Sequence, residues 1–177
     1  GVELSIPSLD STQFTNQLST FEDNNVRDLT FRFDNEIKLN DKHKLEFGVF
    51  ASRVNLDYIL TRDDTLDILD QVQEADNFAV YLQENWKPSK NIDINIGLRA
   101  TYYGLTDKIY YAPRFTGQWS LTEKFKLKGG FGRHFQFVNR VINESITEGS
   151  RDFWLLADND LVDVSQADHF VVGGSYQ

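Results

Sequence analysis

The 177-residue chain contains no cysteine and no methionine. Without cysteine it can form neither a disulfide framework nor a thiolate metal site, and its redox compartment stays undetermined. Proline is scarce as well, and no linker rich in Pro, Gly or Ser divides the chain, so we expect one architectural unit. Because the chain lacks both a start methionine and a signal-peptide pattern, we expect either a processed chain or an internal piece of a longer protein.

Positive charge and long apolar runs are also scarce. The 18 Lys and Arg residues are outnumbered by 27 Asp and Glu residues, which gives a formal net charge of -9 and excludes a nucleic-acid partner on long-range electrostatics. No run approaches the roughly 20 apolar residues that a membrane helix requires. The mean hydropathy of -0.44 is typical of a soluble protein. A transmembrane β-strand shows only alternate residues to lipid, however, so a low mean hydropathy does not exclude a membrane barrel.

Period-two alternation of apolar and polar residues is what the chain has in abundance. It is strictest from Asn77 to Trp119, where Ile94, Ile96 and Leu98 alternate with polar residues. Such a period places all the apolar residues on one face of a β-strand. The pattern predicts seven strands, with either a protein core or lipid against the apolar face, at 28–39, 44–60, 77–86, 92–103, 114–121, 125–137 and 170–177.

The apolar parity changes once within a strand. After Arg53 the apolar residues fall on even positions instead of odd ones. Either a β-bulge near Ser52 or a strand that continues beyond the membrane would explain the change. The residues on the new parity are Val54, Leu56, Tyr58 and Leu60.

Short and long connections alternate along the chain. The period of two is absent from 1–25, 61–76 and 138–166, which we interpret as polar loops, the second with a short helical turn capped by Thr65. Short turns follow one set of strands and longer loops the other, so all the short turns would lie at one end of an up-and-down sheet. Outer-membrane barrels have this asymmetry. The short turns follow Leu39, Trp86 and Leu121, and the longer loops follow Leu60, Tyr103 and Phe137.

Aromatic residues stand at both ends of the apolar band. Trp86 and Trp119 precede short turns, whereas tyrosines cluster beside the loop that follows Tyr103. Rings at both ends are typical of interfacial girdles, so we expect Trp86, Tyr102 and Trp119 to lie at the membrane interface and the apolar face to meet lipid. The other parity would then line a wet lumen with Arg32, Lys38, Arg99, Arg114, Lys126, Lys128 and His134, and with Asp34, Glu36, Glu46 and Asp93.

Four short motifs occur in a fixed order. Residues 81–88 read YLQENWKP, 95–99 read NIGLR, 113–115 read PRF and 128–132 read KGGFG. Together they resemble the mid-barrel of TonB-dependent outer-membrane receptors, over roughly 77–137. The resemblance implies an all-β fold of antiparallel up-and-down transmembrane β-barrel strands. About seven strands of a larger barrel of about 22 strands would occupy 1–177, with the plug domain and the remaining strands outside this chain.

The resemblance also implies a function. It indicates a multi-pass receptor and transporter in the outer membrane of a Gram-negative bacterium, for TonB-coupled uptake of an iron chelate, vitamin, glycan or peptide. The implied partners are outer-membrane lipid, the receptor's own plug domain, the TonB energy-coupling protein and a surface lipoprotein, and no nucleic acid. Two alternatives are a passive pore or structural or secretion barrel without a specific ligand, and a soluble β-sandwich binding module.

Candidate ligand contacts lie in the lumen and in the loops. Arg99 and Arg114 could bind a plug or an anionic substrate, because guanidinium groups bind carboxylates bidentately. The alternative is a solvated ladder of mixed charges. Arg133 and Glu84 are charged exceptions on the apolar parity, both near strand ends, where lipid tolerates charge. The candidate contacts in loops are Asp63, Asp67, Tyr110, Tyr111, Asn143 and Trp154.

Other chemistry is poorly supported by the sequence. The glycines at 129, 130 and 132 lack the spacing and following helix of a phosphate loop, so a bend in the strand is the better interpretation. Aspartates could bind calcium, but they lack EF-hand spacing and are better explained as solvated loop charge. No nucleophile, base and acid form a set, so we predict no enzyme, no cofactor and no metal. The aspartates considered were Asp63, Asp64, Asp67, Asp158, Asp160 and Asp163. The histidines, which we expect to be isolated from any plausible pair of ligands, are His43, His134 and His169.

Overall fold

The structure is a computed structural model that describes residues 20–62, 66–145 and 149–176. These residues form nine β-strands, and no helix among them is long and apolar enough to cross a membrane. The strands are β1 (Thr20–Lys38), β2 (His43–Arg62), β3 (Leu66–Ser89), β4 (Ile92–Tyr103), β5 (Lys108–Ser120), β6 (Phe125–Gln136), β7 (Val138–Ser145), β8 (Gly149–Leu156) and β9 (Ser165–Tyr176).

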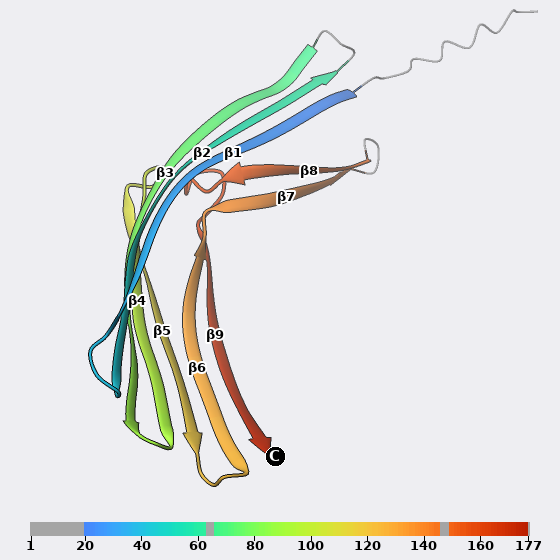
Figure 1. Cartoon of the computed structure of the whole chain (residues 1–177). Helices are drawn as coiled ribbons and strands as arrows, with labels where there is room; N and C mark the ends of the chain where they lie inside the picture. Colours follow the sequence, from blue (N-terminus) through green and yellow to red (C-terminus); the bar gives the residue numbers. More distant parts are fainter. Residues whose placement is uncertain (1–19, 63–65, 146–148, 177) are drawn as a thin grey trace, which may run out of the picture.

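Seven of the strands make one curved antiparallel sheet. Its order is β1-β2-β3-β4-β5-β6-β9, so consecutive strands are neighbours except where β7 and β8 intervene as a separate two-stranded hairpin. Figure 1 shows the sheet as a curved wall, with the hairpin projecting from its concave side. The predicted all-β antiparallel architecture is confirmed, and the strand predicted at 170–177 is the second half of β9.

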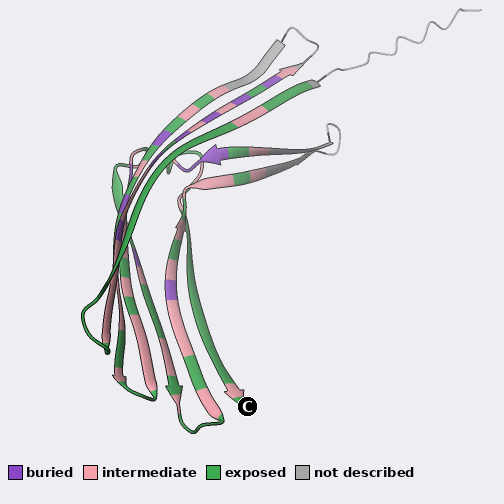
Figure 2. Cartoon of the chain, viewed as in Figure 1, coloured by how far each residue is buried: buried purple, intermediate pink, exposed green. Residues whose placement is uncertain are grey.

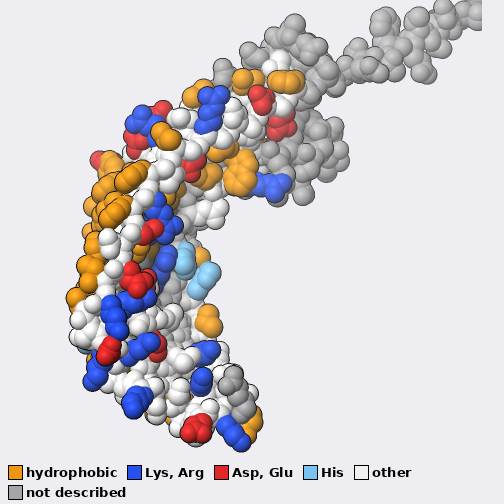
Figure 3. Space-filling model, viewed as in Figure 1, with side chains coloured by type: hydrophobic (Ala, Val, Ile, Leu, Met, Phe, Trp, Pro, Cys, Tyr) orange, Lys and Arg blue, Asp and Glu red, His pale blue; other side chains and the backbone are white. Residues whose placement is uncertain are grey.

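The strand register sorts the side chains onto two faces. Across the sheet, Val49 stands opposite Val80, Val80 opposite Ala100, and Ala100 opposite Tyr111, so these residues share the convex face. Large apolar side chains on this face are exposed, among them Leu29, which is 78% exposed. Orange hydrophobic atoms follow the convex edge in Figure 3. The convex face is therefore an apolar surface that this chain leaves uncovered.

The parity change in β2 has a different cause from a bulge. The β1–β2 register runs without a shift from Lys44 to Arg62, and the shift between β2 and β3 lies at Leu60 and Thr61. The bulge near Ser52 is therefore wrong. The strand continues without a bulge past the apolar band, and its concave face is the one that becomes buried beyond Arg53. The apolar residues of β2 change parity because, beyond Arg53, the buried side chains lie on the concave face of the strand.

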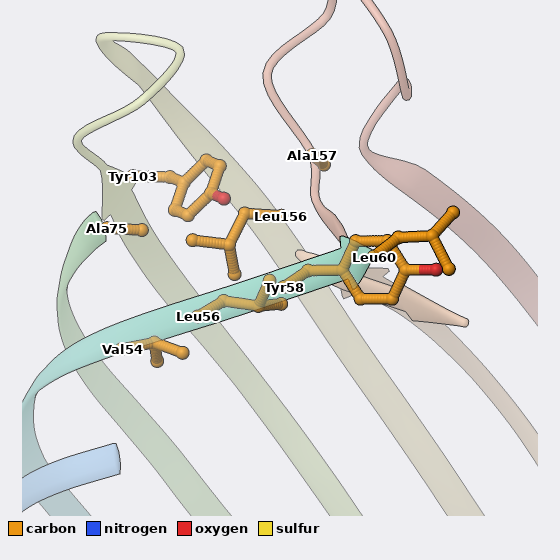
Figure 4. Close-up of a cluster of buried hydrophobic side chains, with 8 residues drawn as sticks. All are labelled: Val54, Leu56, Tyr58, Leu60, Ala75, Tyr103, Leu156 and Ala157. Carbon is orange, nitrogen blue, oxygen red and sulfur yellow. The ribbon is translucent and has the colours of Figure 1, made fainter. Parts of the chain in front are cut away.

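The hairpin β7–β8 and the segment after it cover that concave face. Leu56 and Tyr103 are fully buried there, with Leu156 1% exposed, in a cluster that Figure 4 shows between β2 and the end of β8. Burial in Figure 2 is concentrated in the same region. The rings of Tyr58 and Phe153 stack with centroids 5.0 Å apart. The hairpin is thus anchored to the wall by an apolar core.

Hydrogen bonds add to this anchor. The Leu156 N–H donates to Oε1 of Gln73 at 2.9 Å, and the Ala157 N–H donates to the Phe137 carbonyl at 2.8 Å. Burying apolar side chains while satisfying nearby backbone groups makes such a contact stable.

Three predicted loops differ from the structure. The segment 61–76, predicted as a loop with a helical turn, is mostly strand, because β3 begins at Leu66. The predicted loop 138–166 contains the hairpin β7–β8. Of the segment 1–25, residues 1–19 lie outside the described residues, and β1 begins at Thr20. Where strands extend beyond the apolar band, their residues no longer alternate with a period of two. The sequence pattern therefore did not predict these parts as strands.

The connection after Tyr103 is also shorter than predicted. Residues 104–107 form a tight turn in which the Gly104 N–H donates to the Asp76 carbonyl at 2.8 Å and Asp107 has a φ of 51°. Short and long connections therefore do not alternate strictly. An aspartate tolerates the left-handed conformation that this turn requires.

We expect Leu156→Ala to release the hairpin from the wall. Removing the buried side chain should cost about 2–5 kcal/mol, because it leaves a cavity in the apolar cluster. Hydrogen exchange should then show loss of protection in β7 and β8, with β4 and β5 unchanged. The matched control is Leu161→Ala, which truncates a side chain that is 68% exposed. Equal exchange in the two variants would show that the core does not hold the hairpin.

Candidate functional site

The rings predicted to form a girdle lie on the convex face. Trp86 and Trp119 are exposed on it beside the short turns, and Tyr102 is exposed near its other end. Tyr111, predicted as a ligand contact, lies on this same convex face. The structure therefore places Tyr111 away from the concave side, with the residues of the apolar band.

Two charged exceptions on the convex face are each paired. Arg133 makes a two-pronged ion pair with Asp168, with nitrogen–oxygen distances of 2.7 and 2.8 Å. The Glu84 carboxylate lies 2.6 Å from Nδ1 of His43. Pairing partly offsets the cost of placing a charge next to an apolar surface.

A further ion pair lies where the apolar band of β2 and β3 ends. Arg53 stands opposite Asp76 and donates to both of its carboxylate oxygens, at 2.8 and 2.9 Å. Glu74 approaches the same guanidinium at 3.4 Å. The convex face thus changes from apolar to charged at the position where the parity changes.

The concave face of β1 and β2 carries charges that neutralise one another. Arg32 contacts Asp34, and Lys44 contacts Glu36 at 3.2 Å and Glu46 at 2.9 Å. This half matches the predicted ladder of mixed charges.

The concave face of β4 and β5 is different. Arg99 and Arg114 are diagonal neighbours, because Arg99 pairs with Ala112 in the register. Among the described residues, neither guanidinium has a carboxylate within 4.0 Å. Arg99 lies over the ring of Phe50, 5.0 Å from its centroid, and its Nε is 3.4 Å from the Thr101 hydroxyl. The arginines that the sequence singled out are therefore brought together, with no carboxylate in direct contact among the residues that the structure describes.

A cavity of about 640 Å³ opens on the concave face beside Arg114. Two of its glycines lie close under neighbouring side chains: a Cβ added at Gly130 would lie 3.2 Å from Thr116 Cγ2, and one at Gly132 would lie 3.1 Å from His134 Nε2. The lining polar side chains are Asn85, Asp93, Asn95, Arg114, Thr116, Gln118, Lys128, His134 and His169.

Two histidines that line this cavity are neighbours. The rings of His134 and His169 lie with centroids 5.1 Å apart. β9 pairs with β6 although 28 positions separate Gln136 from Ser165, so the contact depends on the excursion of β7 and β8. The spacing of His134 and His169 in the sequence therefore did not predict this contact.

The remaining predicted contacts do not join this cavity. Tyr110 faces the concave side, where its ring packs against Phe135 and Phe137. Trp154 is half-exposed on β8. Asp63 lies outside the described residues, as do the side chains of Asp67 and Asn143.

Asp158, considered as a calcium ligand, caps a turn. Its Oδ1 accepts three backbone N–H groups at 2.9, 2.8 and 3.2 Å, from Asp160, Leu161 and Val162. Burial alone would raise the pKa of Asp158, but these donors hold that pKa below its ordinary value. Within the described residues no three His, Asp or Glu side chains are grouped to hold a metal ion. The three hydrogen bonds from backbone N–H groups therefore give the Asp158 carboxylate a structural role in the turn.

The family model "TonB dependent receptor-like, beta-barrel" matches residues 3–160. The chain belongs to this family. The family resemblance and fold class predicted from the sequence are thereby confirmed, and the curved sheet is part of the wall of a TonB-dependent receptor barrel. No curated protein sequence matches the chain.

Two solved receptors from Pseudomonas aeruginosa share the fold. A mutant of the ferric enterobactin receptor PfeA in complex with enterobactin has a TM-score of 0.64 and 16% identity, over 87% of this chain and 25% of that one. The siderophore receptor PirA has a TM-score of 0.64 and 15% identity, over 89% of this chain and 30% of that one. This chain therefore spans between a quarter and a third of the receptors that it matches.

The three tryptophans of this receptor-family chain should respond differently to lipid. In vesicles made with brominated lipid, we expect quenching of Trp86 and Trp119, which lie exposed on the convex face, and little quenching of Trp154, which lies on the hairpin. Fluorescence of the intact receptor should therefore lose quenchable signal in W86F or W119F, but not in W154F. If W154F lost as much as W119F, the hairpin would have to contact lipid.

Proposed function

We propose that this chain is part of the wall of an outer-membrane receptor that takes up a nutrient in a TonB-coupled reaction. The family match carries the proposal. The seven-stranded sheet supports it physically, because β1 and β9 are its two edges and do not pair with each other. In lipid, unpaired strand edges are costly, so the wall requires further strands to close a barrel.

The two faces of the wall support a membrane location. The convex face exposes apolar side chains between aromatic and charged rims, whereas the concave face is polar over most of its length. A charge at the middle of a lipid face costs about 2–4 kcal/mol, and the cost falls toward the interfaces. The ion pairs of Arg53 and Arg133 lie at or near the ends of the apolar band, where this cost is smallest.

An iron chelate is the ligand that the structural likeness favours. One similar structure is named as a ferric enterobactin receptor in complex with enterobactin, and the other as a siderophore receptor. Their low identity to this chain transfers the fold but not the contacts, so vitamins, glycans and peptides remain candidate ligands. The receptor's plug domain and the TonB protein complete the proposed machinery, with a surface lipoprotein as a further partner.

Energy coupling separates a receptor from a passive pore. Cells that express the intact receptor should accumulate radiolabelled iron from ferric enterobactin, and the uptake should fall to background in a strain without TonB or after addition of a proton uncoupler. Binding to the cell surface should persist in both cases. Uptake that continues unchanged without TonB would indicate a passive pore. If neither binding nor uptake occurs with this probe, the iron-chelate assignment is wrong, and the same comparison with labelled vitamins, glycans and peptides then tests coupling.

A further inference from the structure

The apolar convex face is hollowed beside the short turns. A hollow of about 370 Å³ lies over β4, β5 and β6, and Gly117 and Gly129 stand opposite each other within it. Each of these three strands pairs with a neighbour on both sides, so further strands that close the barrel would leave the hollow uncovered. The apolar side chains that line it are Ile92, Ile94, Phe115, Trp119 and Leu127.

Side chains of this chain leave the hollow open. A Cβ added at Gly129 would have the Val171 carbonyl oxygen as its nearest neighbour, 3.8 Å away. One added at Gly117 would lie 3.7 Å from the Phe115 ring. Both are ordinary van der Waals separations. An apolar chain that lies between the surrounding side chains would therefore gain dispersion contacts that a flat surface does not offer.

Two lysines flank the end of the hollow that faces the short turns. Lys90 lies in the turn two positions before Ile92, and Lys124 lies in the turn three positions before Leu127. The Ser120 N–H donates to the Asn91 carbonyl at 2.8 Å, which holds the first of these turns against the end of β5.

These turns carry more positive than negative charge. Residues 90–91 and 121–124 contain Lys90, Lys124 and one acidic residue, Glu123. Among the described residues, no carboxylate lies within 4.0 Å of either lysine. Both ammonium groups are therefore available to an anionic group at the end of the hollow.

The opposite end of the convex face has the reverse charge. The strand register places four acidic and two basic side chains there, and the pair between Arg53 and Asp76 already joins two of them. A molecule with an apolar chain and an anionic head is therefore favoured at the short turns and disfavoured at the other end. The six side chains are Asp23, Asp57, Glu74, Asp76, Arg27 and Arg53.

The length of the hollow fits one leaflet of a bilayer. Ile94 stands opposite Gly117, and four positions separate Ile94 from Lys90. That separation is about 13 Å at roughly 3.3 Å per residue. One leaflet takes about 15 Å, half of a hydrocarbon core that is roughly 30 Å thick. An acyl chain whose headgroup lies at the turns would therefore extend over the hollow.

We infer that this hollow is a binding site for one anionic phospholipid. The acyl chain lies over Gly117 and Gly129, and the headgroup phosphate lies between Lys90 and Lys124. The apolar lining holds the chain, whereas the two ammonium groups select an anionic headgroup over a zwitterionic one. The inference rests on the proposed function in one respect, namely that the convex face meets lipid.

Quenching of Trp119 reports occupancy, because this side chain lines the hollow. The intact receptor in micelles of a neutral detergent is titrated with phosphatidylglycerol that is brominated on its acyl chains. The Trp119 signal is the difference between the receptor and its W119F variant. Half-maximal quenching should require at least fivefold less brominated phosphatidylglycerol than brominated phosphatidylcholine, which is zwitterionic and carries the same chains.

Gly129→Val tests the place of the acyl chain. Valine suits an extended strand and would occupy the hollow without a clash, so the variant should fold and require at least fivefold more phosphatidylglycerol. The matched control is Gly173→Val, which adds the same side chain to neighbouring β9 but on the concave face, opposite Lys128. A Cβ at Gly173 meets nothing within 4 Å. This control should change the midpoint less than twofold.

Lys90→Gln with Lys124→Gln tests the place of the headgroup. The double variant should reduce the preference for phosphatidylglycerol over phosphatidylcholine from at least fivefold to less than twofold. Lys108→Gln is the control for charge, because Lys108 begins β5 at the opposite end of that strand. It should leave the preference unchanged. Circular dichroism and thermal unfolding establish that each variant is folded before titration.

Four results would overturn the inference. The first is equal quenching of the wild-type receptor by the two lipids, and the second is an equal effect of Gly129→Val and Gly173→Val. The third is loss of the preference in Lys108→Gln. The fourth is weak quenching by both lipids together with a doubled mass in light scattering, which would assign the hollow to a second copy of the receptor. None of these results alters the test of TonB-dependent uptake, so failure of this inference and failure of the proposed function are distinguishable.

Discussion

The fold depends on hydrogen bonding between strands whose two faces meet different surroundings. Because the backbone pairs across the sheet, side chains alone decide what each face can contact. In the middle of the wall, this constraint separates Val49, Val80 and Ala100 on the convex face from Gly48, Ala79 and Arg99 on the concave face. The period of two therefore arises where one face of a strand meets apolar surroundings and the other meets water. It predicts strands reliably only in those stretches.

The part of the wall beside the hairpin has different surroundings on its two faces. Beyond Arg53 the convex face of β2 carries Asn55 and Asp57, while the concave face packs against the hairpin. The same strand thus has an apolar convex face along one stretch and an apolar concave face along the next, with no change in its register. A bulge would also reverse the parity in the sequence, and only the register distinguishes the two explanations.

Sequence alone predicted β4 well, but it placed the start of β5 at 114 instead of Lys108, and it predicted the strands near the hairpin poorly. From Asn77 to Trp119, lipid on one side and a polar lumen on the other impose strict alternation, and β4 has the predicted bounds within a residue. The hairpin β7–β8 and the first part of β3 have no such alternation, because water or a local core replaces lipid. For the candidate site, parity alone placed Arg99, Arg114, Lys128 and His134 on the concave face. Their lack of acidic partners, and the contact between His134 and His169, required knowledge of which strands pair.

The hairpin and the basic cavity divide the concave face between them. Near the hairpin, Leu56, Tyr103 and Leu156 exclude water from the wall, and in the described part of the cluster no side chain is charged. Farther along the same face, Arg114 and Lys128 are exposed, and no carboxylate of the described residues lies within 4.0 Å of either. The anchoring cluster excludes water without any charged side chain, whereas guanidinium and ammonium groups lie on the part of the face where water can solvate them.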